Sequence, residues 1–366
     1  MDGLAVRVVV AQLCSRVPGG TARYAASLVA ALAAATPAGA QLRGVTSRAC
    51  PATDALDVPV TSLGIPAPAL ARLWERGMPP WVAHEGVVHA PTLLVPPARA
   101  AVPLVVTVHD VVPWTHPQTL TPRGVAFHHR MGARAARDAA AIITPTHAVA
   151  AAVREVLAPA CPVFAVHSGV SVQAAPPDAA ARREHRGIRD PYVLFVGTAE
   201  PRKGLDRLVA AMARPALAGL SLVVVGPPGW GRVEVAELAR AAGIADRVHV
   251  TGRVDEADLA GLYAGARVLA MPSEAEGFGF PVVEAMAHGV PVVTSADPAL
   301  VEVGGGVARV VDPADIEALA QALAEAAAPG TERSEAVRAG RERAASFTWE
   351  ATARHTWRIY ADVARA

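Results

Sequence analysis

The chain is poor in lysine: among its 34 basic residues Lys203 is the single lysine, and the others are arginines. A composition rich in alanine, arginine and glycine is typical of a high-GC genome, in which lysine codons are scarce. A lysine that persists in such a chain is a candidate functional residue, although chance can also place one there. Its ammonium is a compact point charge that fits against one phosphate oxygen, whereas arginine is a broad planar fork.

Cysteine is scarce as well. Cys14, Cys50 and Cys161 are odd in number, widely spaced and without a C-x-x-C pair, so we predict neither a disulfide framework nor a zinc site. This pattern favours a cytoplasmic protein. The opening MDGLAVRVVVAQ has an acidic second residue and too short an apolar run for a signal peptide. Because no stretch reaches the ~20 apolar residues of a membrane span, we expect at most peripheral contact with the inner face of a membrane.

Neither sign of charge dominates. The net charge of +1 gives no overall basic field for nucleic acid, and the chain has no acidic tail. A hydrophobic content of 52% and a mean hydropathy of +0.31 exclude a disordered chain. At 366 residues the chain is long for one compact core, so two domains are expected.

Short β-branched runs alternate with alanine-rich stretches along the sequence. Apolar runs without polar alternation indicate strands buried on both faces. They predict strands at 6–10, 87–89, 104–108, 141–144 and 162–166, and again at 192–196, 220–225, 248–251, 268–271, 290–294 and 308–311. Helices are predicted between them at 21–35, 123–138, 205–213, 233–242, 256–264, 282–288 and 314–327. This order predicts an α/β fold with parallel sheets covered by helices.

The series of strands restarts near residue 191. Before it, residues 173–190 lose β-branched residues and gain prolines and charges, which is typical of a linker. We therefore expect an N-terminal domain at 1–172 and a C-terminal domain at 191–345. The last segment, 346–366, contains Trp349, Trp357 and Tyr360, whose rings need a surface to cover, so we predict a helix that packs back toward the N-terminal domain.

The sequence YVLFVGTAEPRKGLD combines a buried strand, a turn at Gly197 and two adjacent cations, Arg202 and Lys203. In open α/β sheets ligands bind beyond the carboxyl ends of the strands, which is where these cations are expected. Two such charges suit a diphosphate. Two cations on a solvated loop would be the unremarkable alternative.

A second motif, MPSEAEGFGFPVVEAMAHGVPVVTS, follows the strand predicted to end at Met271. Gly277, Phe278 and Gly279 form a turn before a helix, whose backbone N–H groups suit sugar hydroxyls or phosphate oxygens. Glu276 precedes the turn, and Glu284 is placed in the first turn of the helix. Their spacing does not suit the acid and base of a hydrolase, so we expect each to bind different hydroxyl groups. Alternatively, Glu284 complements the helix dipole and Glu276 is solvated.

The two motifs together resemble the signature of retaining glycosyltransferases of family GT4, and in particular its mannosyl- and rhamnosyltransferase-like members with an HD pair. SEAEGFGFPVVEAMAHGVPVVTS is similar to the family's E-x7-E element, and VGTAEPRKGL is similar to its diphosphate motif. Weaker similarities occur in the family's order at PGGTARYAASLVAAL, VTVHDVVPWTHP, ITPTHAVAAAVRE and VHSGV. The resemblance implies a GT-B architecture of two Rossmann-like domains facing across a cleft, with the donor on the second and the acceptor on the first.

By this resemblance the donor site lies mostly in the second domain. Arg202 and Lys203 would neutralise the donor diphosphate, and Glu276 would hold sugar hydroxyls together with the amides of Phe278 and Gly279. Glu284 would bind the ribose. The remaining residues implied at the donor are Gly197, Gly277, and Val254 with Arg253 near the base. Thr198 stands where many members have another residue.

In the first domain Gly19 and Gly20 precede a predicted helix, where they would let the loop approach the donor phosphates; a plain turn is the alternative. His109 and Asp110 follow a strand, and the resemblance puts His109 beside the transferred sugar as a catalytic residue together with Arg202, Lys203 and Glu276. His116 is a weaker candidate. The run His128, His129 and Arg130 has no defined role.

The implied activity is retaining transfer of a hexose from a nucleotide sugar to a hydroxyl acceptor, which is lipid-linked or a small molecule. GDP-mannose is the first choice of donor, with a UDP- or dTDP-sugar second. No Asp-x-Asp pair, which metal-dependent nucleotide-sugar enzymes use, occurs, so we expect no metal and no cofactor. The acceptor is expected around 64–86, where ALARLWERGMPPW suits a membrane-surface contact or an ordinary core helix.

Three other classes of protein are the alternatives. A dehydrogenase would need G-x-G-x-x-G after the first strand, which AQLCSRVPGGTARY lacks. A non-catalytic nucleotide-sugar-binding protein could share the fold and the donor site. A GT-B epimerase or phosphorylase is the enzymatic alternative.

Overall fold

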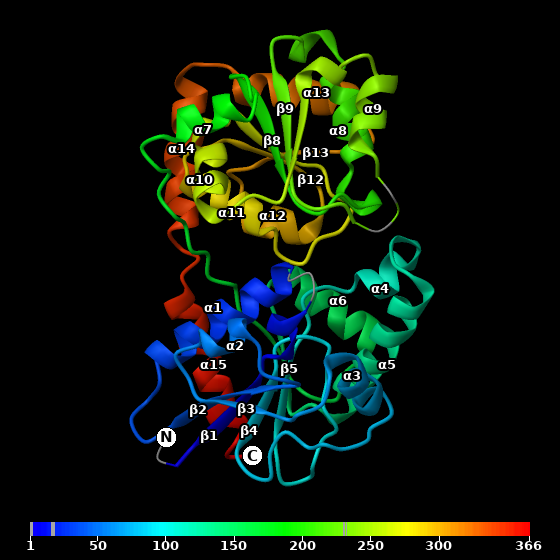
Figure 1. Cartoon of the computed structure of the whole chain (residues 1–366), viewed down its shortest axis with the longest axis vertical. Coiled ribbons are helices and arrows are strands. Elements are labelled where there is room, and N and C mark those ends of the chain that lie inside the picture. Colours follow the sequence, from blue (N-terminus) through cyan, green and yellow to red (C-terminus); the bar gives the residue numbers. More distant parts are fainter. Residues whose placement is uncertain (1–2, 16–18, 230, 232) are drawn as a thin grey trace. The chain divides into compact units, whose positions relative to one another are not determined.

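The computed structural model describes residues 3–15, 19–229, 231 and 233–366, which form two compact units (Figure 1). Unit 1 comprises 1–117, 122–169 and 348–366, and unit 2 comprises 118–121 and 170–347. The predicted arrangement of two parallel α/β sheets in separate halves of the chain is confirmed.

The sheet of unit 1 has seven parallel strands in the order β3-β2-β1-β4-β5-β6-β7 within the described residues. Its strands are β1 (Ala5–Val9), β2 (Gln41–Thr46), β3 (Val60–Ser62), β4 (Val87–Ala90), β5 (Leu104–Thr107), β6 (Ala141–Thr144) and β7 (Val163–Ala165). The helices of unit 1 are η1 (Ala11–Cys14), α1 (Gly20–Ala34), α2 (Pro51–Asp54), α3 (Ala67–Glu75), α4 (Val112–Thr115), α5 (Pro122–Asp138), α6 (His147–Leu157) and α15 (Trp349–Val363). The short helix η2 (Pro117–Thr119) lies where the chain passes between the units.

The sheet of unit 2 has the order β10-β9-β8-β11-β12-β13, the doubly wound arrangement of dinucleotide-binding folds. Its strands are β8 (Tyr192–Val196), β9 (Ser221–Val225), β10 (Val248–Gly252), β11 (Val268–Met271), β12 (Val292–Ser295) and β13 (Arg309–Val311). The helices are α7 (Ala179–His185), η3 (Pro201–Lys203), α8 (Leu205–Met212), η4 (Pro215–Leu217), α9 (Val235–Ala241), η5 (Ala245–Arg247), α10 (Glu256–Gly265), α11 (Phe280–Ala287), α12 (Pro298–Gly304), α13 (Ile316–Ala327) and α14 (Thr331–Ala344). Two apolar clusters cover its faces.

Two strands of unit 1, β2 and β3, were not predicted from the sequence. In β2 exposed polar residues alternate with buried ones, and Gly44 interrupts the apolar pattern. The strand β3 has three residues, lies at the edge of the sheet and buries none of them fully. Edge strands with one wet face lack the continuous apolar runs that identify the central strands.

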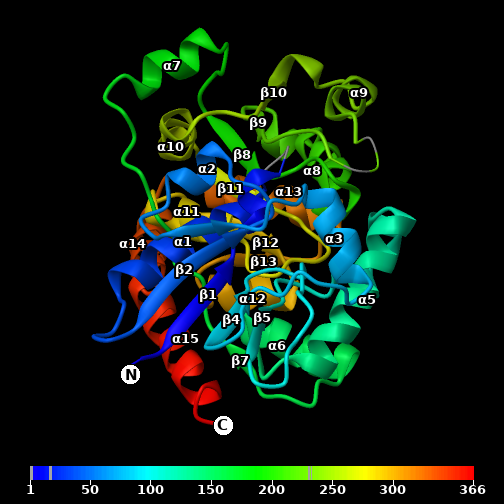
Figure 2. The same ribbon diagram turned by 60° about the horizontal axis from the view of Figure 1, so that its bottom comes forward.

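Residues 173–190, interpreted as a linker, contain the helix α7. It packs on α10 within unit 2 (Figure 2). The buried carboxylate of Asp258 in α10 holds it through ion pairs with Arg182 and Arg186. The charged residues that suggested a solvated linker thus include Arg182 and Arg186, which hold α7 against α10.

The last helix, α15, belongs to unit 1 and packs along α1. The indole of Trp357 donates to the backbone oxygen of Leu32 over 3.0 Å, and the hydroxyl of Thr352 donates to the backbone oxygen of His167 over 2.7 Å. A Cβ on Gly169 would lie 2.2 Å from the backbone nitrogen of Trp349, so only glycine allows this approach. Trp357 and Tyr360 are buried in the contact.

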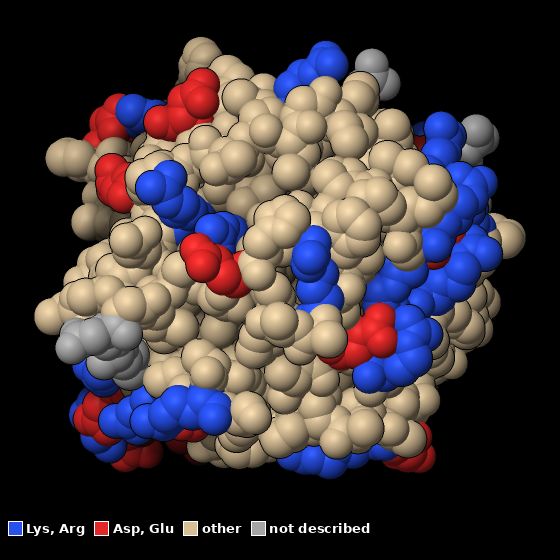
Figure 3. All heavy atoms as spheres, turned by 90° about the horizontal axis from the view of Figure 1, so that it is seen from below, with Lys and Arg blue, Asp and Glu red and all other residues tan. Residues whose placement is uncertain are grey.

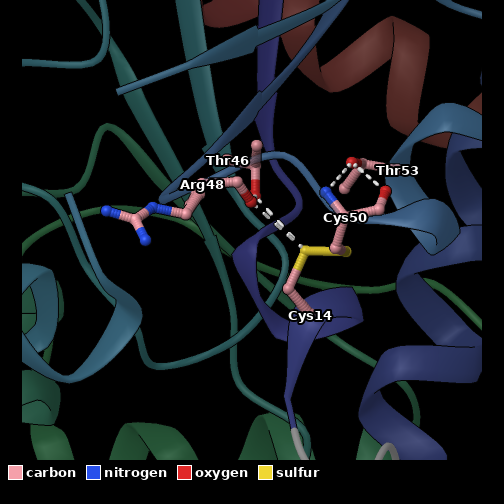
Figure 4. The surroundings of a disulfide bond; sticks show 5 residues. All are labelled: Cys14, Thr46, Arg48, Cys50 and Thr53. Atoms are coloured by element: carbon pink, nitrogen blue, oxygen red, sulfur yellow. Dashed lines mark hydrogen bonds between the residues drawn. A yellow bond between two sulfur atoms is a disulfide. The ribbon is translucent and has the colours of Figure 1, made fainter. Parts of the chain in front are cut away.

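The cysteine spacing predicted no disulfide framework, and the structure corrects this: Cys14 is bonded to Cys50 (Figure 4). Cys14 ends η1, which follows β1, and Cys50 caps α2, which follows β2. Because β1 and β2 pair in parallel, with Val9 opposite Val45, the residues beyond their carboxyl ends lie together. The spacing alone did not reveal the pair because β2 was not predicted. The remaining cysteine, Cys161, is a free thiol.

No helix among the described residues is both long and apolar enough to cross a membrane. On the face shown in Figure 3, acidic side chains lie among the basic ones, and most of the surface is uncharged. This face therefore presents a mixed surface.

We predict that the Cys14–Cys50 bond stabilises unit 1. It closes a loop with a sequence separation of 36, for which the chain-entropy relation gives about 4 kcal/mol. Cys50→Ser should lower the Tm of unit 1 in a non-reducing buffer, and a thiol reductant should lower the Tm of the wild type but not of Cys50→Ser. The matched control is Cys161→Ser, which should respond to reductant as the wild type does. Equal melting of all three proteins would contradict the prediction.

Candidate active site

The two cations of the first motif lie directly after the carboxyl end of β8. Arg202 and Lys203 belong to η3, and Gly204 links this turn to α8 in the left-handed conformation, with φ of 66°. A Cβ on Gly204 would lie 2.4 Å from the backbone oxygen of Pro272, which follows β11. Glycine therefore lets the turn after β8 pack against the segment after β11, where the second motif begins.

This packing brings Lys203 and Glu276 together as a buried ion pair, with side chains 10% and 8% exposed. The guanidinium of Arg202 donates to the backbone oxygen of Ala275 over 2.8 Å and lies 3.4 Å from the carboxylate of Glu276. Its Nε donates to Glu200 over 3.1 Å. The two motifs thus form one cluster.

The electrostatics of the cluster follow from burial and pairing. Burial lowers the pKa of Lys203, an effect that Glu276 opposes. Burial alone would raise the pKa of Glu276, but Lys203 and Arg202 hold it below its usual value. We infer a charged pair at neutral pH. Lys203 is paired with Glu276, and Arg202 is paired with Glu200. An anion that binds here must therefore either share each cation with its carboxylate partner or displace that carboxylate.

The turn of the second motif begins α11, with Gly279 as N-cap in the left-handed conformation (φ 86°). A Cβ there would lie 2.5 Å from a methyl group of Leu300. Phe278 is 4% exposed, and its ring packs edge-on against Phe280 and Phe347. The turn is therefore anchored in the core, and Gly277 continues directly from Glu276.

Glu284 was predicted in the first turn of its helix, and the structure corrects this. The helix α11 begins at Phe280, so Glu284 lies beyond the first turn, and Pro281 is the second helical residue. The carboxylate of Glu284 is 5% exposed and accepts a hydrogen bond of 2.7 Å from the hydroxyl of Tyr263 in α10. A role limited to the helix dipole does not fit this position.

Asp297 is a member of this site that sequence reasoning missed. Its carboxylate accepts from the backbone nitrogens of Ala299 and Leu300 at the start of α12, and from the nitrogen of Glu276 over 3.2 Å. Burial raises the pKa of Asp297. An Asp directly before Pro298 is a helix-start signal that could have located it. Arg207 and Glu274 form a further ion pair beside the cluster.

The other candidates in unit 2 lie at carboxyl ends of strands. Gly197 follows β8 and donates its N–H to the oxygen of Val225 over 2.9 Å. Val254 follows β10 and packs against the apolar cluster that contains Phe278. Arg253 precedes it.

In unit 1 His109 follows β5 beyond its carboxyl end. Its Nε2 lies 2.8 Å from the backbone oxygen of Pro91, which can only accept, so Nε2 carries the proton. The ring of Tyr24 meets the imidazole edge-on, with centroids 4.6 Å apart. Burial lowers the pKa of His109, although Asp110 opposes the shift. His109 is therefore neutral at pH 7, with Nδ1 as its acceptor.

A buried polar chain beside His109 was also missed. The two ring nitrogens of His89 lie 2.6 Å from the hydroxyl of Tyr360 and 2.8 Å from that of Thr107, and Thr107 also contacts the hydroxyl of Tyr24. Burial lowers the pKa of His89 to about 3 and raises the pKa of Tyr24 to about 12. This neutral chain connects α15 with the tyrosine that touches His109.

The remaining polar candidates of unit 1 have partners within the same unit. Asp110 accepts from the backbone nitrogen of Val112 and so begins α4. His116 contacts the neighbouring Thr115. Nδ1 of His128 and Nε2 of His129 contact the backbone oxygens of Gly124 and Pro113, and the ring of His129 stacks on Trp114.

Gly19 and Gly20 form the start of α1. Gly19 is the N-cap in an extended conformation, and Gly20 is the first helical residue. A Cβ at either position would meet no atom within 4 Å. Packing therefore does not require glycine at these two positions. Either a bound ligand or an ordinary turn can account for the two glycines. The preceding residues 16–18 lie outside the described residues.

Helix α3 lies in the region expected at the acceptor. Leu70 and Trp74 of this helix are buried, as in a core helix, whereas Met78 and Trp81 beyond it are 46% and 41% exposed. The guanidinium of Arg99 lies over the ring of Trp81, 5.2 Å from its centroid. The region thus combines a core helix with an exposed apolar turn.

Solved structures share the fold over nearly the whole chain. Sucrose-phosphate synthase from Thermosynechococcus elongatus matches 98% of this chain and 99% of its own, with a TM-score of 0.76 and 23% identity. The Anabaena protein HepE in complex with UDP and glucose matches 98% of this chain and 100% of its own, with a TM-score of 0.72 and 19% identity. These structures show the GT-B fold that the resemblance implied, with a parallel sheet in each half of the chain.

Residues 179–343 match the family model described as "Glycosyl transferases group 1". The match covers less than half of the chain, and it agrees with the resemblance to GT4 that the two motifs showed. The O-antigen chain mannosyltransferase B of Escherichia coli is 34% identical over 172 residues, 46% of this chain and 45% of that protein. An MMP α-(1→4)-mannosyltransferase of Mycolicibacterium hassiacum is 37% identical over 186 residues, 49% and 44%. The matched stretch thus spans less than half the length of either relative.

The buried ion pair predicts a pH-dependent stability. Because the folded-state pKa of Glu276 lies below its ordinary value of 4.5, its ionisation stabilises the fold above that pH, and this contribution is lost as the pH falls through the folded-state pKa. Glu276→Gln leaves Lys203 uncompensated and should cost about 3–5 kcal/mol at pH 7. Denaturant unfolding should show this difference narrowing in acid. The control is Glu317→Gln, on the exposed carboxylate of α13, which should follow the wild-type curve. If the difference in unfolding free energy between the wild type and Glu276→Gln did not change with pH, the buried ion pair would not have the proposed effect on stability.

Proposed function

We propose that this protein is a retaining glycosyltransferase that moves a hexose from a nucleotide sugar to a hydroxyl acceptor. The observation that supports it best is the buried cluster of Arg202, Lys203 and Glu276 after β8 and β11. A hydrolase would not need two cations there, whereas the departure of a nucleoside diphosphate requires cations where negative charge develops. The family match over residues 179–343 includes this cluster.

In this proposal Lys203 and Arg202 bind the diphosphate, and Glu276 binds sugar hydroxyls. When the diphosphate arrives, its oxygens replace the carboxylate in front of Lys203, which frees Glu276 to accept from those hydroxyls. This exchange thus makes Lys203 available to the diphosphate and Glu276 available to the sugar. The amides of Gly277, Phe278 and Gly279 face the sugar or its phosphates, Glu284 takes the ribose, and Gly197 and Val254 line the site near the diphosphate and the base. Gly19 and Gly20 approach the donor phosphates from unit 1.

Reaction begins as the bond between the anomeric carbon and the phosphate oxygen breaks. The cations stabilise the leaving diphosphate, the acceptor hydroxyl attacks from the side that it vacates, and the diphosphate takes the hydroxyl proton. Configuration is therefore retained. His109, neutral and held by Pro91 and Tyr24, steadies the transferred sugar through Nδ1.

The donor proposal is GDP-mannose, and mannosyltransferases among the relatives support it. UDP-sugars are the alternative, since HepE was solved with UDP-glucose. We also propose that no metal is needed, because Arg202 and Lys203 supply positive charge at the diphosphate. We propose a cytoplasmic location on the ground of this donor alone, because the Cys14–Cys50 bond removes the argument from the scarce cysteines. At most peripheral contact with the inner membrane face fits the exposed turn at Met78 and Trp81.

The test of the donor is thermal unfolding with GDP, UDP and dTDP and their hexoses, with and without EDTA. The matching nucleotide should stabilise the protein by about 2.7 kcal/mol at one hundred times its Kd, and EDTA should not reduce the shift. Stabilisation by a nucleotide sugar without transfer or slow hydrolysis would favour a non-catalytic binding protein.

Lys203→Ala should reduce kcat at least about 100-fold, because it removes a donor to the leaving group. Lys203→Arg keeps the charge but replaces the compact ammonium with a fork, so it should recover activity only in part. Release of nucleoside diphosphate from a nucleotide sugar is the measurement, with circular dichroism to verify folding. A folded Lys203→Ala protein with wild-type turnover would refute the proposed role of the cluster.

A further inference from the structure

The start of helix α12 is anchored by the carboxylate of Asp297, which lies in the loop after β12. Its Oδ1 accepts from the backbone nitrogens of Ala299 and Leu300, each over 3.0 Å, and its Oδ2 accepts from the backbone nitrogen of Glu276 over 3.2 Å. Pro298 follows directly and disfavours a helical backbone at Asp297, whose ψ is 129°. Three donors and a restricted backbone thus fix the position of this carboxylate.

Capping of α12 accounts for only one of the two oxygens. A helix cap needs a single side-chain oxygen, and serine caps as well as aspartate does. Asp315, for example, caps α13 through Oδ1. The second oxygen of Asp297 instead reaches the motif after β11. Ser295, at the end of β12, makes a similar contact, because its hydroxyl donates to the backbone oxygen of Ser273. The end of β12 and the loop after it therefore hold two backbone groups of that motif.

The turn from Glu276 to Gly279 is held by α12 at both of its ends. The hydrogen bond to Asp297 fixes the first residue of the turn. Leu300, which is fully buried in α12, packs against the last residue, since a Cβ on Gly279 would lie 2.5 Å from its methyl group. Neither contact involves the cations after β8, so the turn keeps its position independently of what those cations bind.

The proposed exchange of partners needs this independent support. The carboxylate of Glu276 is paired with Lys203, and in the proposed function a diphosphate replaces it there. A side chain released in this way would lose its fixed position at the moment when it has to bind the sugar hydroxyls. The hydrogen bond to Oδ2 of Asp297 is made by the backbone of Glu276, so it can persist while the side chain changes its partner.

We propose that Asp297 is a positioning residue that fixes the backbone of Glu276 for recognition of the transferred sugar. This inference rests on the proposed function, which assigns Glu276 to the sugar hydroxyls and the two cations to the diphosphate. Loss of the contact should therefore weaken recognition of the sugar and leave binding of the nucleoside diphosphate in place. A residue that only capped α12 would not separate the two.

Asp297→Ser tests this role, because serine retains a cap for α12 and has no second oxygen for Glu276. With GDP-mannose as donor, and UDP-glucose in parallel, kcat/KM is measured by release of the nucleoside diphosphate. It should fall about tenfold, the equivalent of one hydrogen bond. The Kd of GDP or UDP alone, measured by calorimetry, should equal the wild-type value, since neither contains the transferred sugar. Asp315→Ser, which changes the cap of α13, is the control and should alter neither quantity.

Asp297→Asn is the second variant if Asp297→Ser does not fold. It has nearly the same size and keeps one accepting oxygen for the cap, but it places an amide nitrogen opposite the N–H of Glu276, so the same result is expected. A folded variant with wild-type kcat/KM, or with equal losses for the nucleotide sugar and for the free nucleoside diphosphate, overturns the role of Asp297 and leaves the transferase standing. A wild-type protein that turns over no nucleotide sugar would refute the proposed function, and this inference with it.

Discussion

The structure of the candidate site depends on one interaction, the burial of Lys203 against Glu276. Each group needs the other, because a single charge at this depth would be far more costly than the pair. The contact requires the turn after β8 to touch the segment after β11, which Gly204 permits. The helices α8 and α11 then start from turns held in this arrangement. The site is neutral while Lys203 is paired with Glu276, and in the proposed function an anion binds by replacing Glu276 as the partner of Lys203.

The candidate site residues of the two units differ in charge. The candidate site of unit 2 is built on the buried charges of Lys203 and Glu276, and the hydrogen bond between Asp297 and the backbone nitrogen of Glu276 links them to α12. Around His109 in unit 1, the tyrosines, Thr107 and His89 form a neutral network, since burial keeps His89 uncharged. Charged groups suit a diphosphate and neutral ones suit hydroxyls. The electrostatic contrast agrees with the proposed roles of the two units.

The sequence predicted the central strands well because each is a continuous apolar run buried on both faces. It did not predict β2 and β3, because their exposed polar residues interrupt the apolar run that identifies a strand. The disulfide was not predicted either, because it depends on the position of β2. Lys203 and Glu276 were found because their types stand out in their motifs. His89 and Tyr24 were missed because nothing in their local sequence distinguishes them, and their importance comes from contacts between distant segments.

The position of α15 affects how the protein can be divided. The family match ends at residue 343, and unit 2 ends at Phe347, yet Thr348–Ala366 completes unit 1. The first unit is therefore discontinuous in sequence. A fragment ending near residue 169 would lack the helix that covers α1 and would expose the surface that receives Trp357 and Tyr360. Each unit is compact, but no single cut in the sequence separates the two, so an exchange of unit 1 between proteins would have to move the segment after residue 347 together with the segment before residue 170.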